Sequence, residues 1–223
     1  MLASFGDDFH AVVVGSNGGI GAALITALGV CGSVTGLTRA DFDLADPPSI
    51  AAAAARLDSP LDLVIVATGR LGPTPERRLA DLDAAALAEQ FAINTVLPAL
   101  VAQAFLPKLR RDRKTAFAAL SARVGSIGDN RLGGWHGYRA SKAALNQLIR
   151  TMAIEHRRTH PLGLCVALHP GTVDTGLSKP FQRGVRDLFT PGEAAEHLLD
   201  VLDRLTPEDS GGLFAWDGSA IPF

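Results

Sequence analysis

Two residues of the sequence are placed so that they could transfer a proton together. Tyr138, the only tyrosine in the chain, lies four residues before Lys142, one of four lysines. Four residues is about one helical turn, so both side chains would project from the same face of a helix. An ammonium group beside a phenol favours the phenolate and lowers the phenol pKa below its usual value of about 10. The pair predicts an acid–base catalyst that works near neutral pH. The alternative is a chance pairing of an aromatic residue with a surface lysine.

A glycine-rich turn near the N-terminus predicts a phosphate-binding site. The apolar residues 11–14 have the composition of a buried strand, and Gly15, Gly19 and Gly21 follow before an apolar helical stretch, 22–30. Gly15 would permit a tight turn, Gly19 would let a pyrophosphate approach the backbone, and Gly21 would allow close packing of strand and helix. The N–H groups and positive dipole end of the helix would face the anion. Glycine turns follow many strands, so the motif depends on the rest of the chain for support.

Length and composition indicate one domain that spans residues 1–223. The chain is 47% hydrophobic and 20% charged, which is enough apolar sequence for a large core. A net charge of −2 gives no reason to expect nucleic acid or an anionic membrane as a partner. Residues 1–9 lack the pattern of a secretory signal, and we expect no stretch that spans a bilayer. Cys31 and Cys165 lack metal-ligand spacing and are interpreted as buried thiols, so we expect a cytoplasmic protein without a metal site.

Strand-like and helix-like segments alternate along the chain. The strand candidates are residues 11–14, 33–37, 62–67, 115–120, 164–168 and 213–215. The helix candidates are residues 20–30, 48–57, 84–111, 136–160 and 191–205. Continuous apolar runs such as 63–66 are typical of a parallel sheet that is covered on both faces. The pattern predicts an α/β fold with a doubly wound, mostly parallel sheet, helices on both faces, and ligands at the carboxyl ends of the strands.

Three further motifs accompany the glycine turn and the tyrosine–lysine pair. They are Asp43 in Asp41-Phe42-Asp43-Leu44, Asn94 in Ile93-Asn94-Thr95-Val96, and the run Pro170-Gly171-Thr172-Val173-Asp174-Thr175. In this order the five motifs resemble those of the short-chain dehydrogenase/reductase family, over nearly the whole chain. More narrowly, Gly133-Gly134-Trp135 and residues 214–223 resemble the C-factor and sniffer-like carbonyl reductases. The resemblance implies a single-domain Rossmann fold.

The resemblance also implies a reaction, which is hydride transfer between NAD(P)H and a carbonyl or alcohol carbon of a small molecule. Tyr138 would give its proton to the carbonyl oxygen, or accept it in the reverse direction. Lys142 would lower the pKa of Tyr138 and bind the ribose hydroxyls. Asn94 would help to hold a water that reconnects Lys142 to solvent, and it could equally satisfy the backbone of a kinked helix. His136 could line the substrate mouth or be a simple loop histidine.

One catalytic residue of the family is missing at its expected place, where this chain has Ala122. A serine there would hydrogen-bond the substrate carbonyl and stabilise developing negative charge. Ser121 is the first candidate for this role and Ser126 is the second. Two alternatives stay open: Ser121 could merely end a strand, or the chain could lack this serine, as relatives that resemble dihydropteridine reductase do.

The resemblance assigns the coenzyme contacts. They are Gly15, Ser16, Asn17, Gly19, Ile20, Gly21, Arg39, Asp43, Ala67, Thr68, Gly69, Lys142, Pro170, Gly171, Val173 and Thr175. Gly69 matches the family, whereas the asparagine that usually precedes it is absent. Thr38 stands where NAD-preferring members have an acid, and the guanidinium of Arg39 can bind a 2′-phosphate through charge-assisted hydrogen bonds. We therefore expect NADP(H) to be favoured over NAD(H); a solvated strand-end arginine is the alternative.

The substrate is not identified by any motif. Residues 175–190 are expected to form a lid over the substrate pocket, with the charges of Lys179, Arg183 and Arg186 in solvent. Two other functions stay open: a nucleotide-binding signalling or redox-sensing protein with little turnover, and a pteridine reductase. The family also implies a homodimer or homotetramer that is paired through the helices predicted at 84–111 and 136–160.

Overall fold

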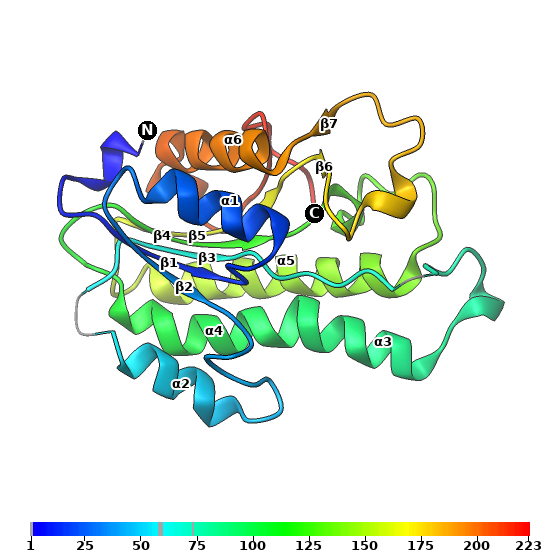
Figure 1. The fold of residues 1–223 in the computed structure, drawn as a ribbon, viewed down its shortest axis with the longest axis horizontal. Coiled ribbons are helices and arrows are strands. Elements are labelled where there is room, and N and C mark those ends of the chain that lie inside the picture. Colours follow the sequence, from blue (N-terminus) through cyan, green and yellow to red (C-terminus); the bar gives the residue numbers. More distant parts are fainter. Residues whose placement is uncertain (1, 58–59, 73) are drawn as a thin grey trace.

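A six-stranded parallel sheet forms the centre of the molecule in the computed structural model, which describes residues 2–57, 60–72 and 74–223 (Figure 1). The strand order is β2-β1-β3-β4-β5-β8, and every neighbouring pair is parallel. The strands are β1 (His10–Val14), β2 (Ser33–Leu37), β3 (Leu63–Val66), β4 (Thr115–Leu120), β5 (Gly163–His169) and β8 (Leu213–Ala215). β3 and β4 are buried along their whole length, as sequences that are apolar apart from Thr115 predict for a sheet covered on both faces.

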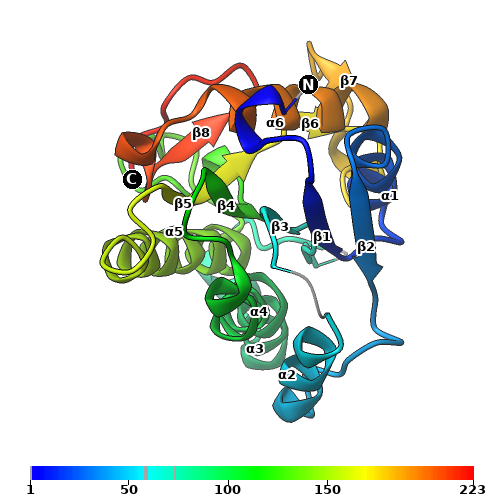
Figure 2. The same ribbon diagram turned by 90° about the vertical axis from the view of Figure 1, so that its left-hand side faces the viewer.

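Helices cover both faces of this sheet. They are α1 (Gly19–Leu28), α2 (Pro47–Ala55), α3 (Ala84–Phe91), α4 (Leu97–Phe105), α5 (His136–His156) and α6 (Pro191–Arg204). α1 and α6 lie on one face, and α2, α4 and α5 lie on the other (Figure 2). Each face therefore has its own apolar core. The predicted fold class, a doubly wound Rossmann-type sheet, is confirmed.

The predicted helix over residues 84–111 is not one regular helix. A π-helical turn, Ala92–Val96, separates α3 from α4, and a 3₁₀ turn, Leu106–Lys108, ends the run. A π turn inserts one residue into the helical repeat and often occurs at a functional site. Here it contains Asn94. Sequence periodicity did not show this interruption, because the apolar pattern continues through it.

The same run corrects the expectation that no stretch could span a bilayer. By length and composition, the segment Ala84–Lys108 is apolar enough to cross a membrane. In the fold, however, α3 and α4 pack against α5 and α2. Leu97, Val101 and Phe105 of α4 join the core beneath the sheet. The segment is thus used as a packed helix of the domain.

The order of the strands creates a crevice at the carboxyl end of β1. The chain proceeds from β1 to β2 on one side, whereas β3, β4, β5 and β8 follow on the other side. Such a reversal leaves neighbouring crossovers on opposite faces of the sheet, and ligands bind in the opening between them.

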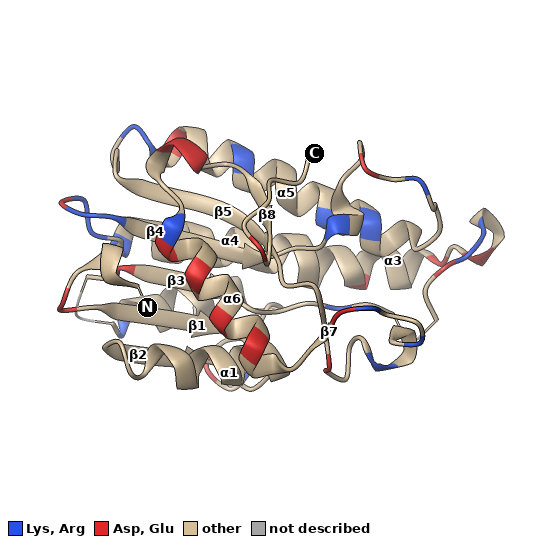
Figure 3. Cartoon of the chain, turned by 90° about the horizontal axis from the view of Figure 1, so that it is seen from above, with Lys and Arg blue, Asp and Glu red and all other residues tan. Residues whose placement is uncertain are grey.

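Residues 172–190, which include the segment expected to form a lid, contain a small sheet that the sequence did not predict. β6 (Thr172–Val173) and β7 (Leu188–Phe189) make a small separate parallel sheet, with a 3₁₀ turn, Lys179–Phe181, between them. Two-residue strands are too short to show an alternating pattern. Lys179, Arg183 and Arg186 of this segment are exposed, as expected, whereas the outer face of α6 presents Glu193, Glu196 and Asp200 (Figure 3).

The two cysteines differ from each other. Cys165 lies in the core on β5, and burial raises the pKa of its thiol to about 12. Cys31 follows α1 and is only half-buried, so the expectation that both are buried is wrong for Cys31.

Candidate active site

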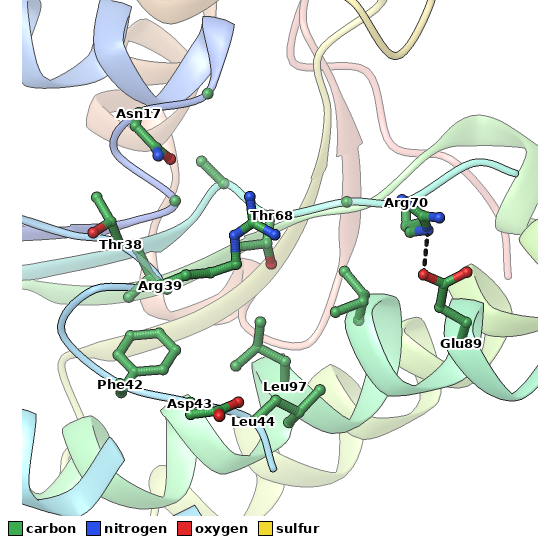
Figure 4. A pocket seen from close by; sticks show the side chains of 16 residues that line it. Asn17, Thr38, Arg39, Phe42, Asp43, Leu44, Thr68, Arg70, Glu89 and Leu97 are labelled. Atoms are coloured by element: carbon green, nitrogen blue, oxygen red, sulfur yellow. Dashed lines mark ion pairs between the residues drawn. The ribbon is translucent and has the colours of Figure 1, made fainter. Parts of the chain in front are cut away.

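A first pocket of about 650 Å³ opens at the carboxyl ends of β1, β2 and β3 (Figure 4). Of the residues expected to contact the coenzyme, those that line it are Gly15, Asn17, Arg39, Asp43, Ala67, Thr68 and Gly69. An ion pair of 2.8 Å between Arg70 and Glu89 lies at its wall (Figure 4). We call this cavity the coenzyme pocket. It lies at the crevice that the strand order creates.

The glycine turn forms one wall of the coenzyme pocket and is packed without spare space. Gly15 has φ +86°, a left-handed conformation that favours glycine. A Cβ at Gly21 would lie 2.1 Å from the Gly15 carbonyl oxygen, so the predicted close packing is real. A Cβ at Gly19 would lie 2.7 Å from Thr175 Cγ2, which shows that Gly19 also brings the start of α1 up to the segment after β6.

Two features of this pocket fit a phosphorylated dinucleotide. The first intrahelical hydrogen bond of α1 runs from Ala22 N to Gly18 O at 2.8 Å, so the preceding amides are at the open helix end. Within the described part of the chain, the buried Thr68 hydroxyl has no hydrogen-bond partner. The pocket thus provides both amide donors for an anion and an unused hydroxyl in its wall.

The side chain of Arg39, just after β2, has no acidic partner among the described residues. Arg39 is exposed, and Figure 4 shows its side chain projecting into the coenzyme pocket. Among the described residues it forms no ion pair. The nearby acid, Asp41, is occupied by the Thr38 N–H and hydroxyl, which donate to it at 2.7 and 3.0 Å. The Asp43 carboxylate accepts from Ala45 N at 2.9 Å and so also stabilises a turn.

A second pocket, of about 370 Å³, lies at the carboxyl ends of β4 and β5. It contains Tyr138, and we call it the substrate pocket. Five further expected coenzyme contacts also line it: Ile20 of the glycine turn, and Pro170, Gly171, Val173 and Thr175. Leu177, Ser178 and Phe181 of the segment 175–190 complete its wall. Ser16 lies outside both linings, and its hydroxyl donates to Leu37 O at 3.3 Å.

Lys142 lies where the two pockets approach each other. A Cβ at Gly69, which lines the coenzyme pocket, would lie 3.9 Å from Lys142 Nζ and 3.7 Å from Leu177 of the substrate pocket. Nζ donates to Leu120 O at 2.7 Å and lies 5.9 Å from the centre of the Tyr138 ring. The tyrosine and the lysine are therefore neighbours on α5, as their spacing predicts.

The pKa values of this pair differ from the expectation. Burial raises the pKa of Tyr138 to about 12 and lowers the pKa of Lys142 to about 7. Each side chain is almost removed from water, and desolvation disfavours the charged form of both. The predicted lowering of the Tyr138 pKa by a charged lysine is therefore wrong for this structure. The phenol keeps its proton throughout the physiological pH range.

Asn94 joins three parts of the site from within the π turn. Its Nδ2 donates to Arg70 O at 2.8 Å and to Ser141 Oγ at 3.0 Å, while its Oδ1 accepts from Arg70 N at 2.7 Å. Thr95 Oγ1 donates to the carbonyl oxygen of Ser141 at 2.8 Å. Asn94 thus ties the loop after β3 to α5, directly beside Tyr138 and Lys142 in the chain.

The two candidate serines occupy different surroundings. Ser121 lines the substrate pocket next to Ala122, but its hydroxyl donates to Asn146 Oδ1 at 2.7 Å. Ser126 is buried outside the pocket lining, where its Oγ accepts from Asp129 N at 3.0 Å. The structure therefore brings only Ser121 to the pocket.

Several residues of the substrate pocket were missed from the sequence. His136 is absent from the pocket lining, whereas His169 at the end of β5 lines it. Burial lowers the pKa of His169 to about 4, so this imidazole is neutral. Trp135 and Phe181 also line the pocket. Trp135 carried only a family signal in the sequence, and Phe181 carried none, because its approach depends on the path of the segment 175–190.

Known proteins share this architecture and sequence. The family described as short chain dehydrogenase matches residues 35–185. C-signal of Myxococcus xanthus is 38% identical over 147 residues, which are 65% of this chain and 83% of that protein. The 1-hydroxy-2-glutathionyl-2-methyl-3-butene dehydrogenase of Rhodococcus sp. (strain AD45) is 35% identical over 182 residues, which are 80% of this chain and 77% of that protein.

A solved structure extends the comparison to the whole chain. The NADPH-bound carbonyl reductase from chicken fatty liver has a TM-score of 0.84 with 26% identity, and the match covers 99% of this chain and 97% of that chain. The family match alone covers more than half of the sequence. The chain therefore belongs to the short-chain dehydrogenase family of oxidoreductases, as its five motifs predict.

Proposed function

We propose that this protein is an NADP(H)-dependent oxidoreductase that transfers a hydride between nicotinamide and a carbonyl or alcohol carbon of a small molecule. One observation carries the proposal: the tyrosine–lysine pair connects the two pockets. Tyr138 lines the substrate pocket, and Lys142 Nζ would lie 3.9 Å from a Cβ on Gly69, which is in the wall of the coenzyme pocket. A proton donor and a coenzyme are thereby offered to the same substrate.

The choice of NADP(H) is supported by the end of β2. Arg39 projects into the coenzyme pocket without an acidic partner among the described residues, and it can bind a 2′-phosphate. Thr38 takes the place of the acid that would accept hydrogen bonds from both ribose hydroxyls of NAD. The chicken carbonyl reductase, which has the same fold, is bound to NADPH. Gly15 and the open end of α1 would hold the pyrophosphate, and Lys142 the ribose beside the nicotinamide.

In the proposed reduction, a hydride with its two electrons would come to the carbonyl carbon from NADPH, held by the glycine turn, Arg39 and Lys142. The Tyr138 phenol gives its proton to the carbonyl oxygen as the C=O π bond breaks, so that one C–H and one O–H bond form. Because burial raises the pKa of Tyr138 to about 12, the phenol carries the proton that this step consumes. Burial lowers the pKa of Lys142 to about 7, so this amine can release and take up a proton near neutral pH.

Asn94 and Ser121 support this chemistry in different ways. Asn94 holds the loop after β3 against α5 through its three side-chain hydrogen bonds. Ser121 stays our candidate for the missing serine, although its hydroxyl proton is directed to Asn146. It would have to rotate to donate to a substrate oxygen.

The proposal is tested with a Tyr138→Phe variant. We expect turnover with NADPH across a panel of an aldehyde, a ketone and a quinone to fall by about 10²–10⁴-fold. Affinity for NADPH, measured by fluorescence titration, should stay within about threefold, because Tyr138 does not line the coenzyme pocket. Ser121→Ala is the comparison. A drop in turnover of about 10²-fold would indicate that Ser121 donates a hydrogen bond to the substrate oxygen. Nearly unchanged turnover would indicate that Ser121 only supports Asn146.

A second function, coenzyme binding with little turnover, is favoured by the alanine at position 122 and by the similarity to C-signal. Equal behaviour of wild-type protein and Tyr138→Phe across the panel would support it and would contradict the enzyme. Adding a quinonoid dihydropterin to the panel tests the pteridine reductase.

We also propose a homodimer or homotetramer that is paired through α4 and α5. Leu100, Leu148 and Met152 of these helices line an open groove of about 700 Å³. A monomeric mass in sedimentation at micromolar concentration would contradict this assembly. The cytoplasmic location and the restriction to small-molecule partners stay predictions from composition.

A further inference from the structure

The backbone just before α5 has an unusual conformation. Gly133, Gly134 and Trp135 are all left-handed, with φ values of 62°, 64° and 52°. Trp135 and Leu2 are the non-glycine residues with positive φ in the described part of the chain. A bulky side chain is strongly disfavoured there, because its Cβ crowds the backbone. Strain of this kind is kept where the surrounding structure imposes it, and often where function uses it.

Hydrogen bonds on both sides hold Trp135 in place. Its N–H donates to Glu76 O at 2.6 Å, and its carbonyl oxygen accepts the first helical bond of α5 from Arg139 N at 2.8 Å. Arg139 Nε also donates to Gly133 O and Gly134 O at 3.2 and 3.0 Å. The buried Glu76 carboxylate accepts from Gly137 N at 3.4 Å, beside the helix start. The tryptophan is thus fixed by two elements at once.

This conformation sets the indole between the tyrosine and the segment 175–190. The Trp135 ring lies edge-on to the Tyr138 ring, with centroids 6.2 Å apart and planes at 71°. It also lies edge-on to Phe181, at 5.0 Å and 62°. All three residues line the substrate pocket. Such edge-to-face arrangements are the preferred contacts of aromatic rings.

Three polar side chains of the same pocket are engaged elsewhere, whereas the buried His169 Nδ1 has no hydrogen-bond partner among the described residues. Arg123 pairs with Asp129 at 3.0 Å, and the Ser121 hydroxyl donates to Asn146. The Ser178 hydroxyl donates to the carbonyl oxygen of Val173. Leu71, Val124 and Leu177 add apolar surface. Beside the Tyr138 phenol, the His169 imidazole and the side chains of Thr172 and Thr175, a substrate faces mainly aromatic and aliphatic surface.

We infer that Trp135 is a specificity-determining residue, which selects carbonyl compounds that carry an aromatic ring next to the carbonyl group. Trp135 would form, with Phe181 and Tyr138, an aromatic wall against the bound ring. This inference rests on the proposed function. The pocket of about 370 Å³ would also hold the nicotinamide, so the space that is left suits a compound of one ring rather than a large polycyclic one. A flat ring gains edge-to-face contacts with Trp135 and Phe181 that a saturated ring of the same size lacks.

The test compares benzaldehyde with cyclohexanecarbaldehyde, its saturated counterpart, in wild-type protein with NADPH. Intrinsic reactivity cancels when each variant is compared with wild type. The measured quantity is kcat/KM for benzaldehyde divided by kcat/KM for cyclohexanecarbaldehyde. We expect Trp135→Ala and Trp135→Gly to lower this ratio by about three- to tenfold, and Phe181→Ala to lower it less. Leu132→Ala, an exposed residue of the same loop, should leave the ratio unchanged. A ratio that Trp135→Ala and Trp135→Gly also leave unchanged would overturn the inference.

Two further measurements separate the possible causes. Glycine adopts the left-handed conformation readily, so Trp135→Gly should unfold at a higher urea concentration than Trp135→Ala. Loss of selectivity in both variants then cannot come from misfolding. If wild-type protein reduces neither aldehyde, the proposed function fails for these compounds. Binding of the unreactive amides benzamide and cyclohexanecarboxamide to the NADP⁺-loaded protein then tests the aromatic wall alone. Preference for benzamide that is lost in Trp135→Ala supports the inference, and equal binding overturns it.

Discussion

The coenzyme pocket and the substrate pocket are built from different materials. The glycine turn of the coenzyme pocket is largely main chain, and a methyl group at Gly21 would already collide with the Gly15 carbonyl at 2.1 Å. The substrate pocket is formed by side chains from separated segments, among them Tyr138 on α5, His169 on β5 and Phe181 after β6. Gly176, in the segment beside it, has open space around its Cβ position.

This difference explains why one pocket can be recognised from spacing and the other cannot. A main-chain turn needs glycine at particular positions, so its geometry is written in a short motif. Side-chain walls tolerate many residue types, and their members meet only after the chain has folded. The coenzyme half should therefore respond sharply to small changes, and the substrate half should respond gradually.

The largest effect is expected from one methyl group in the glycine turn. Gly21→Ala should weaken NADPH binding by more than about 100-fold and lower the free energy of unfolding by about 3 kcal/mol, since backbone must move. Gly176→Ala makes the same change where no atom lies within 4 Å, and it should alter stability by less than about 0.5 kcal/mol. Fluorescence titration with NADPH and urea unfolding of both variants would measure the two effects. Similar losses in the two variants would contradict the contrast between the pockets.

A smaller effect is expected from Lys142, which stands between the pockets. Burial lowers the pKa of Lys142 to about 7, so between pH 7 and 9 the unfolded chain binds a proton that the folded chain does not. The free energy of unfolding of the coenzyme-free protein should therefore rise with pH in this window, by about 2 kcal/mol from this group. From about pH 8 upward the raised pKa of Cys165, about 12, acts in the opposite direction and reduces this rise.

Urea unfolding at pH 7, 8 and 9 measures this rise. Lys142→Met should remove it, and Lys179→Met, at an exposed lysine, should preserve it. If the free energy of unfolding rose equally with pH in wild-type protein and in Lys142→Met, the buried amine would be charged in the folded state. The proton exchange proposed for Lys142 would then be contradicted.

The smallest effect concerns a charge at the surface of the coenzyme pocket. Arg39→Glu should lower the ratio of NADPH to NADH affinity by at least about tenfold, because a carboxylate repels the 2′-phosphate and accepts hydrogen bonds from ribose hydroxyls. Arg183→Glu reverses the charge of an exposed arginine in the segment 175–190, outside the coenzyme pocket, and should leave this ratio unchanged. Fluorescence titrations with both coenzymes measure it. An unaltered ratio in Arg39→Glu would make Arg39 a solvated strand-end residue.

Most of the fold could be predicted, because buried parallel strands are continuous apolar runs. The predictions over 33–37, 115–120 and 213–215 match β2, β4 and β8. The π turn around Asn94 was missed, since one inserted residue does not disturb a helix that is apolar on more than one side. The sheet of β6 and β7 was missed because each strand has only two residues.

The chemical groups of the site were visible in the sequence, whereas their energetics were not. Residues four apart lie on one face of any helix, so the spacing of Tyr138 and Lys142 already places both on one face of α5. The glycines of the first turn are required by local sterics. Covalent and helical geometry acts over a few residues, so it can be read from a few residues. The pKa directions, the engagement of Ser121 by Asn146 and the contact of Trp135 with Phe181 depend on burial and on segments far apart in the chain. Desolvation and ring contact arise only when those segments pack together, and for that reason they required the folded molecule.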